Sequence, residues 1–365
     1  MSAKKTPLYD HHIKAGGNVV DYAGWMLPVE YEGLIPEHEA VRNAAGLFDV
    51  SHMGEVTVQG PDAQKFLNYL FTNDLTKSED FGITYGMFCY EDGGVVDDLL
   101  IYRKGENDYY LVPNASNTAK DYEWMLENAK DFDVQIKNIS DSVGEIAIQG
   151  PNAQKILQKL TETDLAGIGY YKFDDQVMVA GKPTMVSRTG YTGEDGFEVY
   201  ASREDIGEIW DALLEVGEED GLKPTGLGCR DTLRFEAGMP LYGNEMTEEI
   251  NPLQAGLKYF VKLDKEADFV GKEALSKQWA DGLKQKIVGL ELTGKGIPRH
   301  GYEVLKDDKV IGHITTGYMP PTVGKPIANA LIDIDQTELG NEVEVQIRKR
   351  RVPAKVISRK FLEKK

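Results

Sequence analysis

The adjacent carboxylates Asp97 and Asp98 are the first candidates for chemistry, in the segment EDGGVVDDLLIYR. They follow a glycine pair inside an expected strand, so their side chains point to opposite faces. Such a pair cannot flank one bond as the acid and base of a glycosidase. At most one of the two therefore faces a binding cavity, and the alternative is that both belong to an exposed strand.

A further candidate carboxylate is Glu198, near the end of the segment SRTGYTGEDGFEVY. Gly193 and Gly196 permit tight turns there, and the alternation that follows predicts a strand. Glu198 points opposite to Phe197, so it faces a crevice if Phe197 enters the core. The spacing differs from phosphate-binding glycine loops, and the acidic side chains would repel phosphate. The alternative is an exposed strand position.

Arg230 is a candidate cation in GLGCRDTLRFEAGMPLYGNE, where we expect a helix to begin at about Asp231. An acidic residue suits the positive end of the helix dipole, whereas a cation does not. The guanidinium of Arg230 could therefore clamp a carboxylate or a ring carbonyl. A structural ion pair explains this position equally well.

The remaining reactive side chains give weaker signals. Cys89 and Cys229 are far apart in the chain, so we expect neither a disulfide framework nor a thiolate zinc site. The six histidines lack metal-ligand spacing, which disfavours metal catalysis. Cys89 is expected in a buried strand, and no Ser or Cys stands in a nucleophile elbow.

An internal repeat organises the elements that position these candidates. Residues 54–70, GEVTVQGPDAQKFLNYL, match residues 144–160, GEIAIQGPNAQKILQKL. Each copy predicts a strand, a Gly-Pro turn and an amphipathic helix. A later strand and helix at 109–129 is echoed at 197–217. The sequence therefore predicts a duplicated α+β module, with a ligand crevice where its halves meet.

The last part of the chain has a different pattern. From about residue 283, short alternating runs broken by Gly, Pro and Asp-Asp turns predict a small antiparallel barrel or sandwich. We therefore expect a tandem α+β region over residues 1–283 and a β-barrel domain over 284–365. A polar helical stretch around 272–286 is the expected linker.

A basic segment ends the sequence. Its last twenty positions hold one acid, Glu363, and nine basic residues: Arg348, Lys349, Arg350, Arg351, Lys355, Arg359, Lys360, Lys364 and Lys365. Such a patch suits an acidic partner or a phosphorylated or polycarboxylate ligand. The alternative is a solvated, charged edge strand that resists aggregation.

Composition limits the class of protein. The 365 residues, 41% of them hydrophobic, exceed one average domain and can bury a sizeable core. The 41 basic and 60 acidic residues give a net charge of −19, which repels nucleic acid and anionic lipid. No apolar run approaches the ~18 residues of a membrane span, and the start MSAKKTPLYD lacks a secretory h-region. We therefore expect a cytoplasmic protein.

Taken together, these segments resemble the aminomethyltransferase (T-protein) family of the glycine cleavage system. The matching motifs run in order through nearly the whole chain: TPLYD (6–10), FDVSHMGEV (48–56), DGGVVDDLLIYR (92–103), YYLVPNASN (109–117), RTGYTGEDGFE (188–198), RDTLRFEAGMPLYGNE (230–245), IPRHGYEV (297–304) and GHITTGYMPPTVGKPIANAL (312–331). The resemblance implies duplicated α+β folate-binding modules around a central cavity, with a C-terminal antiparallel β-barrel.

The resemblance also implies an activity. The aminomethyl group on the lipoyl arm of H-protein gives its methylene to tetrahydrofolate, which yields 5,10-methylenetetrahydrofolate, ammonia and dihydrolipoyl H-protein. Tetrahydrofolate is then a co-substrate, H-protein is the partner, and no metal is implied. The same fold hosts relatives with other activities, and the alternative here is a non-catalytic folate-binding protein that supports iron–sulfur assembly.

Residue roles follow from the matched motifs. Asp98 matches the family's catalytic carboxylate, which would stabilise a cationic aminomethyl or iminium centre and help a folate nitrogen lose its proton. Glu198 matches the pteridine-binding glutamate, and Arg230 matches a folate-contacting arginine. Five further residues align near cavity positions and would supply stacking and apolar walls: Tyr110, Val112, Met53, Tyr85 and Tyr191. A substrate-contacting tyrosine found near the C-terminus of some members has no counterpart in SRKFLEKK.

Overall fold

The computed structural model describes residues 3–362, which fall into two compact units. The first unit holds the chain up to Leu67 together with Leu75–Tyr85 and Leu99–Leu233. The second unit holds Asn68–Asp74, Gly86–Asp98 and the chain from Arg234 onward. Within residues 3–362, no helix is both long and apolar enough to cross a membrane.

The internal repeat forms two sheets with the same strand order. The first copy contributes β5 (Val56–Gln59), β6 (Ile83–Cys89), β7 (Val95–Gly105) and β8 (Asp108–Val112), in the order β6-β7-β8-β5. The second copy contributes β10 (Val143–Gln149), β11 (Phe173–Val179), β12 (Lys182–Ser187) and β13 (Gly196–Ser202), in the order β11-β12-β13-β10. This shared order confirms the duplicated α+β module.

Each copy turns at the glycine before its proline. Gly60 and Gly150 have φ of 136° and 134°, a region that L side chains rarely adopt. A Cβ at either glycine would also collide with a backbone oxygen, that of Asp133 or Ala44. The expected helices follow these turns as α3 (Ala63–Leu70) and α5 (Ala153–Leu157), and α5 continues as a 3₁₀ turn (Gln158–Leu160). The glycines therefore permit each strand to pass directly into its helix.

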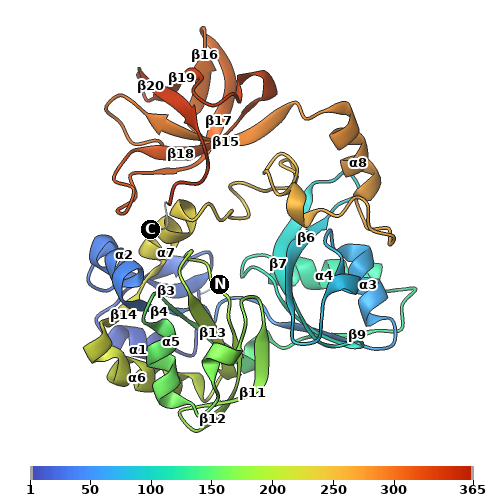
Figure 1. Ribbon diagram of the computed structural model, residues 1–365, viewed down its shortest axis with the longest axis vertical. Helices are drawn as coiled ribbons and strands as arrows, with labels where there is room; N and C mark the ends of the chain where they lie inside the picture. Colours follow the sequence, from blue (N-terminus) through green and yellow to red (C-terminus); the bar gives the residue numbers. More distant parts are fainter. Residues whose placement is uncertain (1–2, 363–365) are drawn as a thin grey trace. The chain divides into compact units, whose positions relative to one another are not determined.

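The sheet of the second copy separates a core face from a polar face. Helices α5 and α6 (Ile206–Gly217) cover the core face (Figure 1), where Phe197, Trp210 and Leu213 are buried. Burying one such side chain contributes about 1.5–3 kcal/mol. Strands β4 (Ala45–Asp49) and β14 (Leu222–Thr225) complete the sheet beside β10. The opposite face of β13 carries Glu198 and Tyr200.

Further elements flank these sheets. Strand β9 (Gln135–Asn138) pairs with β5, and α4 (Thr118–Asn128) packs against β9. Near the start of the chain, β1 (Lys4–Lys5), β2 (Asn18–Tyr22) and β3 (Trp25–Glu30) form a three-stranded sheet, with helices α1 (Tyr9–Lys14) and α2 (Leu34–Asn43). Two more helices are α7 (Leu227–Glu236) and α8 (Lys272–Asp281). Helix α8 accounts for most of the polar helical stretch expected around 272–286.

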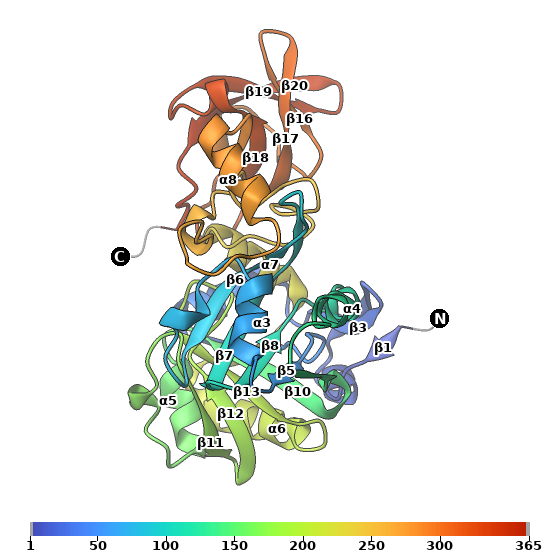
Figure 2. The same ribbon diagram turned by 90° about the vertical axis from the view of Figure 1, so that its right-hand side faces the viewer.

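The C-terminal strands form the expected antiparallel barrel, drawn in orange and red in Figure 2. Its strands are β15 (Gln285–Leu292), β16 (Glu303–Lys306), β17 (Lys309–Tyr318), β18 (Ile327–Asp333), β19 (Glu342–Ile347) and β20 (Arg350–Ile357). They close in the order β15-β18-β17-β16-β19-β20. Alternate residues such as Leu290, Ile314 and Val356 fill the interior, as a small closed barrel requires.

The alternative of a charged edge strand at the C-terminus is wrong, because β20 is not an edge strand. Strand β20 pairs with both β15 and β19, so its backbone groups are used on both sides. Its basic residues Arg350, Arg351 and Lys355 are nevertheless exposed, and Arg351 forms ion pairs with Asp308 and Glu344. Glu363, Lys364 and Lys365 lie outside the described residues. The basic segment is therefore the outer face of a closing strand.

Candidate functional site

Glu198 lies on the polar face of β13, opposite its core-facing neighbour. Phe197 is fully buried in the core and Glu198 is 8% exposed, so the strand separates the two side chains as expected. Gly193 has a turn conformation with φ of 79°. The expectation of a turn at Gly196 is wrong: its φ is not in the left-handed region, and the residue is small because a Cβ would collide with the Ile148 carbonyl oxygen.

Hydroxyl groups surround the Glu198 carboxylate. Thr189 donates a hydrogen bond to Oε2 of Glu198, and the Thr189 hydroxyl lies 2.6 Å from that of Ser187. Burial raises the pKa of Glu198, while the hydrogen bond from Thr189, the charge of Arg230 and the hydrogen bond from Tyr200 oppose this rise. These contacts all favour the ionised form. Glu198 is thus equipped to act as a buried hydrogen-bond acceptor.

Three tyrosines from three strands pack edge to face beside Glu198. Tyr102 on β7, Tyr110 on β8 and Tyr200 on β13 have ring centroids 5.8–5.9 Å apart. The hydroxyls of Tyr102 and Tyr200 are 2.8 Å apart. Val112 and Met53 pack in the same cluster. The structure therefore joins three of the expected cavity residues, Tyr110, Val112 and Met53, in one aromatic and apolar wall.

The expected helix start at Asp231 is wrong, because α7 begins four residues earlier at Leu227. Arg230 is therefore inside the helix, where its backbone N–H donates to the Gly226 carbonyl oxygen at 3.3 Å. Arg230 is still in the first turn of α7, near the positive end of the helix dipole. The guanidinium carbon lies 4.8 Å from the centroid of the Tyr191 ring, a cation–π contact that orients the side chain.

Arg230 supplies the positive charge near this carboxylate. Its charge helps to lower the pKa of Glu198, against the larger effect of burial. His52 does not add a second charge, because burial and then Arg230 lower its pKa to about 4. Glu198, Arg230 and Tyr191 thus form an acceptor, a cation and an aromatic ring within the first unit.

Two of the expected site residues lie on the neighbouring strands of the first repeat copy. Tyr85 is half-buried on β6, in the first unit. Asp98 is half-buried on β7, and it belongs to the second unit. Asp97 is fully buried, so the alternative of two exposed carboxylates is wrong. The different burial of Asp97 and Asp98 agrees with side chains on opposite faces of β7.

Comparison with protein families covers nearly the whole chain. A model described as the GCVT N-terminal domain matches residues 8–265. A second, described as the glycine cleavage T-protein C-terminal barrel domain, matches residues 285–363. The chain belongs to the glycine cleavage T-protein family.

Relatives and a solved structure agree with this family assignment. The chain is 56% identical to an aminomethyltransferase of Thermoanaerobacter pseudethanolicus, covering 99% of this chain and 98% of the relative. It is 55% identical to an aminomethyltransferase of Alkaliphilus oremlandii, covering 98% and 97%. The crystal structure of glycine cleavage system aminomethyltransferase T from Bartonella henselae superposes with a TM-score of 0.90, at 30% identity over 99% of this chain and 98% of that one.

These similarities confirm the expectation of an aminomethyltransferase. They extend over the full length of the named relatives, and so they do not favour the non-catalytic alternative that supports iron–sulfur assembly.

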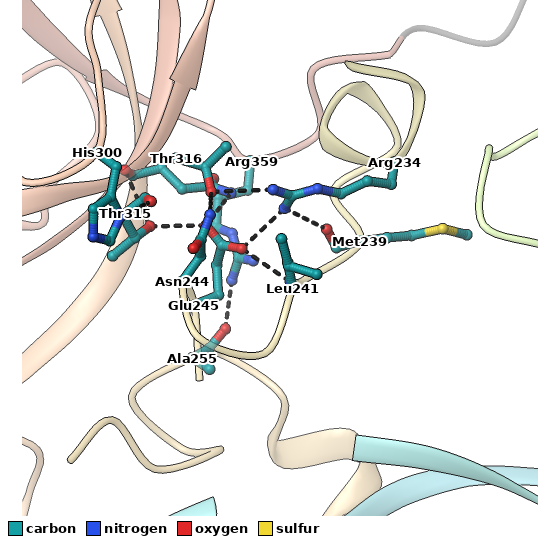
Figure 3. Close-up of polar contacts among 11 residues, drawn as sticks. Arg234, Met239, Leu241, Asn244, Glu245, Ala255, His300, Thr315, Thr316 and Arg359 are labelled. Carbon is teal, nitrogen blue, oxygen red and sulfur yellow. Dashed lines mark hydrogen bonds and ion pairs between the residues drawn. The ribbon is translucent and has the colours of Figure 1, made fainter. Parts of the chain in front are cut away.

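The second arginine of the T-protein motif RDTLRFEAGMPLYGNE has a structural role. Arg234 is fully buried and lies 3.0 Å from Glu245 (Figure 3), and it also donates to the Met239 carbonyl oxygen. Glu245 accepts further hydrogen bonds from the backbone N–H of Leu241 and the hydroxyl of Thr315. This ion pair fastens the loop after α7 to barrel strand β17.

The cysteines of this T-protein family member are unsuited to catalysis. Cys89 and Cys229 are fully buried, and burial raises the pKa of both thiols well above the usual range. A thiol that does not ionise is neither a nucleophile nor a metal ligand. Within residues 3–362, no group of three or more His, Cys, Asp or Glu side chains could hold a metal ion.

Sequence reasoning missed the buried partners of Glu198. Glu145 on β10 and Tyr200 on β13 stand opposite each other in the sheet, and both are buried. The available signal was the Gly-Glu pair that begins both repeat copies, at Glu55 and Glu145. A glutamate at an otherwise apolar strand position is rarely buried without a partner.

Proposed function

We propose that this chain transfers the methylene of an aminomethyl group, carried on the lipoyl arm of H-protein, to tetrahydrofolate. The products are 5,10-methylenetetrahydrofolate, ammonia and dihydrolipoyl H-protein, and a cytoplasmic location is part of this proposal. The observation that carries it is the buried acceptor Glu198 beside Arg230 and an aromatic wall, in a chain that matches named aminomethyltransferases over its full length.

The pterin ring of tetrahydrofolate suits the chemistry around Glu198. Its 2-amino-4-oxo pyrimidine edge has adjacent N–H donors, and a carboxylate accepts two of them with its two oxygens. Tyr110, Val112 and Met53 offer apolar and aromatic surface for the ring faces. Arg230, held by Tyr191, offers N–H donors for a ring carbonyl or a carboxylate of the folate tail.

Asp98 is the proposed catalytic residue. The nitrogen of the aminomethyl group first expels the lipoyl sulfur as a thiolate, which takes up a proton to give dihydrolipoyl H-protein and leaves the methylene carbon as a cationic iminium centre. One folate nitrogen attacks this carbon, ammonia then leaves, and the second folate nitrogen bonds to the carbon. Each attacking N–H must lose its proton. A carboxylate next to the reacting carbon stabilises the cation and accepts a proton, which typically contributes about 10²–10⁴-fold in rate. Asp98 is half-buried on β7.

An ammonia-release assay tests the function directly. Purified enzyme is mixed with aminomethylated H-protein, with and without tetrahydrofolate, and ammonia and 5,10-methylenetetrahydrofolate are measured. We expect release that depends strongly on tetrahydrofolate. Folate binding without any release of ammonia would instead identify a non-catalytic folate-binding protein.

The variant Asp98→Asn tests the role of the catalytic carboxylate. It keeps the size of the side chain but removes its charge, so we expect turnover to fall by about 10²–10⁴-fold with folate affinity largely kept. Asp131→Asn is the matched control, because Asp131 is exposed between α4 and β9. Near-normal turnover of D98N would remove Asp98 from the mechanism.

A further inference from the structure

Three glutamates are buried around the tyrosines of the first unit. Glu55 and Glu145 begin the two repeat copies and are 0% and 2% exposed, and Glu198 is 8% exposed. Glu145 stands directly opposite Tyr200 in the β10–β13 pairing. One arginine, Arg230, acts on Glu145 and Glu198. Since buried charges must be compensated, one cation cannot balance three carboxylates.

Counting the protons around Tyr200 shows which carboxyl group is neutral. The Tyr200 hydroxyl is hydrogen-bonded to that of Tyr102, and it lies near the carboxyl groups of Glu145 and Glu198, whose pKa values it acts to lower. A phenol has one proton to donate. Glu198 also accepts from Thr189 and feels the charge of Arg230, so it is the ionised acceptor. If Tyr200 donates its proton to Glu198, a hydrogen bond between Glu145 and Tyr200 requires a proton on Glu145.

The second oxygen of Glu145 supports the same assignment. Oε2 of Glu145 is buried and has no hydrogen-bond partner within residues 3–362. If Glu145 were ionised, burial of this oxygen without a hydrogen bond would carry a large desolvation cost. If Glu145 is a neutral acid the cost is much smaller, because the oxygen is then a much weaker acceptor.

The groups that raise the pKa of Glu145 outweigh those that lower it. Burial raises the pKa of Glu145 well above its usual range, and the charges of Glu198 and Glu55 raise it further. The hydrogen bond from Tyr200 and the charge of Arg230 oppose this rise but are smaller. The other titratable neighbours, Tyr102 and Tyr110, have pKa values raised chiefly by burial and stay neutral.

We propose that Glu145 is a neutral carboxylic acid at physiological pH and a positioning residue for the candidate site. It donates a hydrogen bond to Tyr200, which leaves the Tyr200 proton for Glu198 and orients that carboxylate toward the N–H donors of a ligand. The identity of the ligand as a folate rests on the proposed function, but the proton on Glu145 does not.

The proposal predicts a dependence on alkaline pH. A carboxyl group with a raised pKa is neutral at pH 7 and loses its proton as the pH rises through that value. Ionised Glu145 can no longer donate to Tyr200, and it places a second negative charge beside Glu198. Ligand affinity should therefore fall on the alkaline side.

Tetrahydrofolate binding measured anaerobically from pH 6 to pH 10 tests this dependence. The wild type should weaken by about tenfold across the alkaline range, the size of one lost buried hydrogen bond. The side chain in Glu145→Gln cannot ionise and keeps an N–H donor. At pH 7 the affinity of this variant for tetrahydrofolate should therefore differ from that of the wild type by less than about threefold. Its affinity should not decline at alkaline pH. Glu145→Ala should be weak at every pH. Glu215→Gln, on the exposed side of α6, should follow the wild type.

Infrared spectroscopy of the protein without ligand gives a readout that is independent of folate. The difference between wild type and E145Q at pH 7 should contain the carbonyl stretch of one protonated carboxylic acid. Absence of that band, or an alkaline decline in E145Q equal to that of the wild type, overturns the proposal. Loss of affinity in E145Q as large as in E145A at pH 7 also overturns it. A band without any folate binding supports the assignment of Glu145 and contradicts the proposed function.

Discussion

Glu198 combines burial with neighbours that favour its ionised form, and the proposed ligand recognition requires this combination. Its oxygens are removed from water, so each hydrogen bond that they accept is stronger than on the surface. The hydroxyls of Thr189 and Tyr200 and the charge of Arg230 compensate for the lost hydration. A carboxylate held in this way needs little reorganisation when it accepts N–H groups from a ring.

Glu198→Gln should weaken tetrahydrofolate binding by about 10–100-fold at pH 7, the usual size of a lost hydrogen bond to a charged group. The amide keeps the shape of the side chain but replaces one acceptor by a donor that faces the donors of the pterin. Equilibrium titration under anaerobic conditions measures the change. Glu204→Gln, at an exposed position after β13, is the matched control, and equal affinities for both variants would contradict this role of Glu198.

Residue-scale predictions from the sequence succeeded where strand alternation decides them. The opposite orientations of Phe197 and Glu198 follow from their adjacent positions. The start of α7 was missed because Gly226 and Gly228 flank Leu227, and glycine disfavours helices. Packing in the folded chain overrides that preference, which places Arg230 inside the helix.

Helix α7 has a second function beside carrying Arg230. Its next turn ends in Arg234, whose guanidinium is fully buried against Glu245 and the Met239 carbonyl oxygen. The pair stabilises the loop between α7 and the barrel strands because each charge satisfies the other away from water. Removing one partner of such a buried ion pair destabilises the protein strongly, whereas replacing both partners by uncharged residues destabilises it less.

Arg234→Met should destabilise the protein by about 3–5 kcal/mol, because it removes the ion-pair partner of the buried Glu245 carboxylate. Thermal unfolding followed by circular dichroism or calorimetry measures the loss. The double variant R234M/E245Q removes both charges and should recover part of the lost stability. A double variant less stable than R234M would show that the charge of Glu245 is compensated by other groups.

At the scale of elements, the sequence predicted the duplication but not the tyrosine cluster. Matching Gly-Pro turns at the same offsets predicted both copies, and the shared strand order follows. The contact between Tyr102 and Tyr200 joins strands from different copies. It leaves no periodic trace in the sequence, because it depends on how two sheet faces pack.

The whole molecule is strongly acidic, with a net charge of −19, yet the turn and strand at 348–355 are basic. Closure of the barrel points the basic residues of β20 outward in alternation with apolar ones. This surface is the place where we expect an acidic carrier protein to dock, since opposite charges steer association.

Reversing the charges of Arg350 and Arg351 to Glu should weaken H-protein binding by about tenfold at low salt, as expected for two exposed ion pairs. Folate affinity should not change. Raising the salt concentration should weaken H-protein binding to the wild type much more than to this variant. Lys130→Glu, at an exposed site outside the barrel, is the control, and unchanged carrier affinity of the double variant would favour a purely solvated surface.

Strand β20 also determines when the barrel can be completed during synthesis. In the barrel, β20 lies between β15 and β19. In the sequence, β19 directly precedes β20, whereas β15 is far from it. While the nascent polypeptide still lacks residues 350–357, both of those strands have open edges that can pair with other chains. Barrel closure is therefore delayed until residues 350–357 have left the ribosome, and premature termination before residue 350 would release a product prone to aggregate.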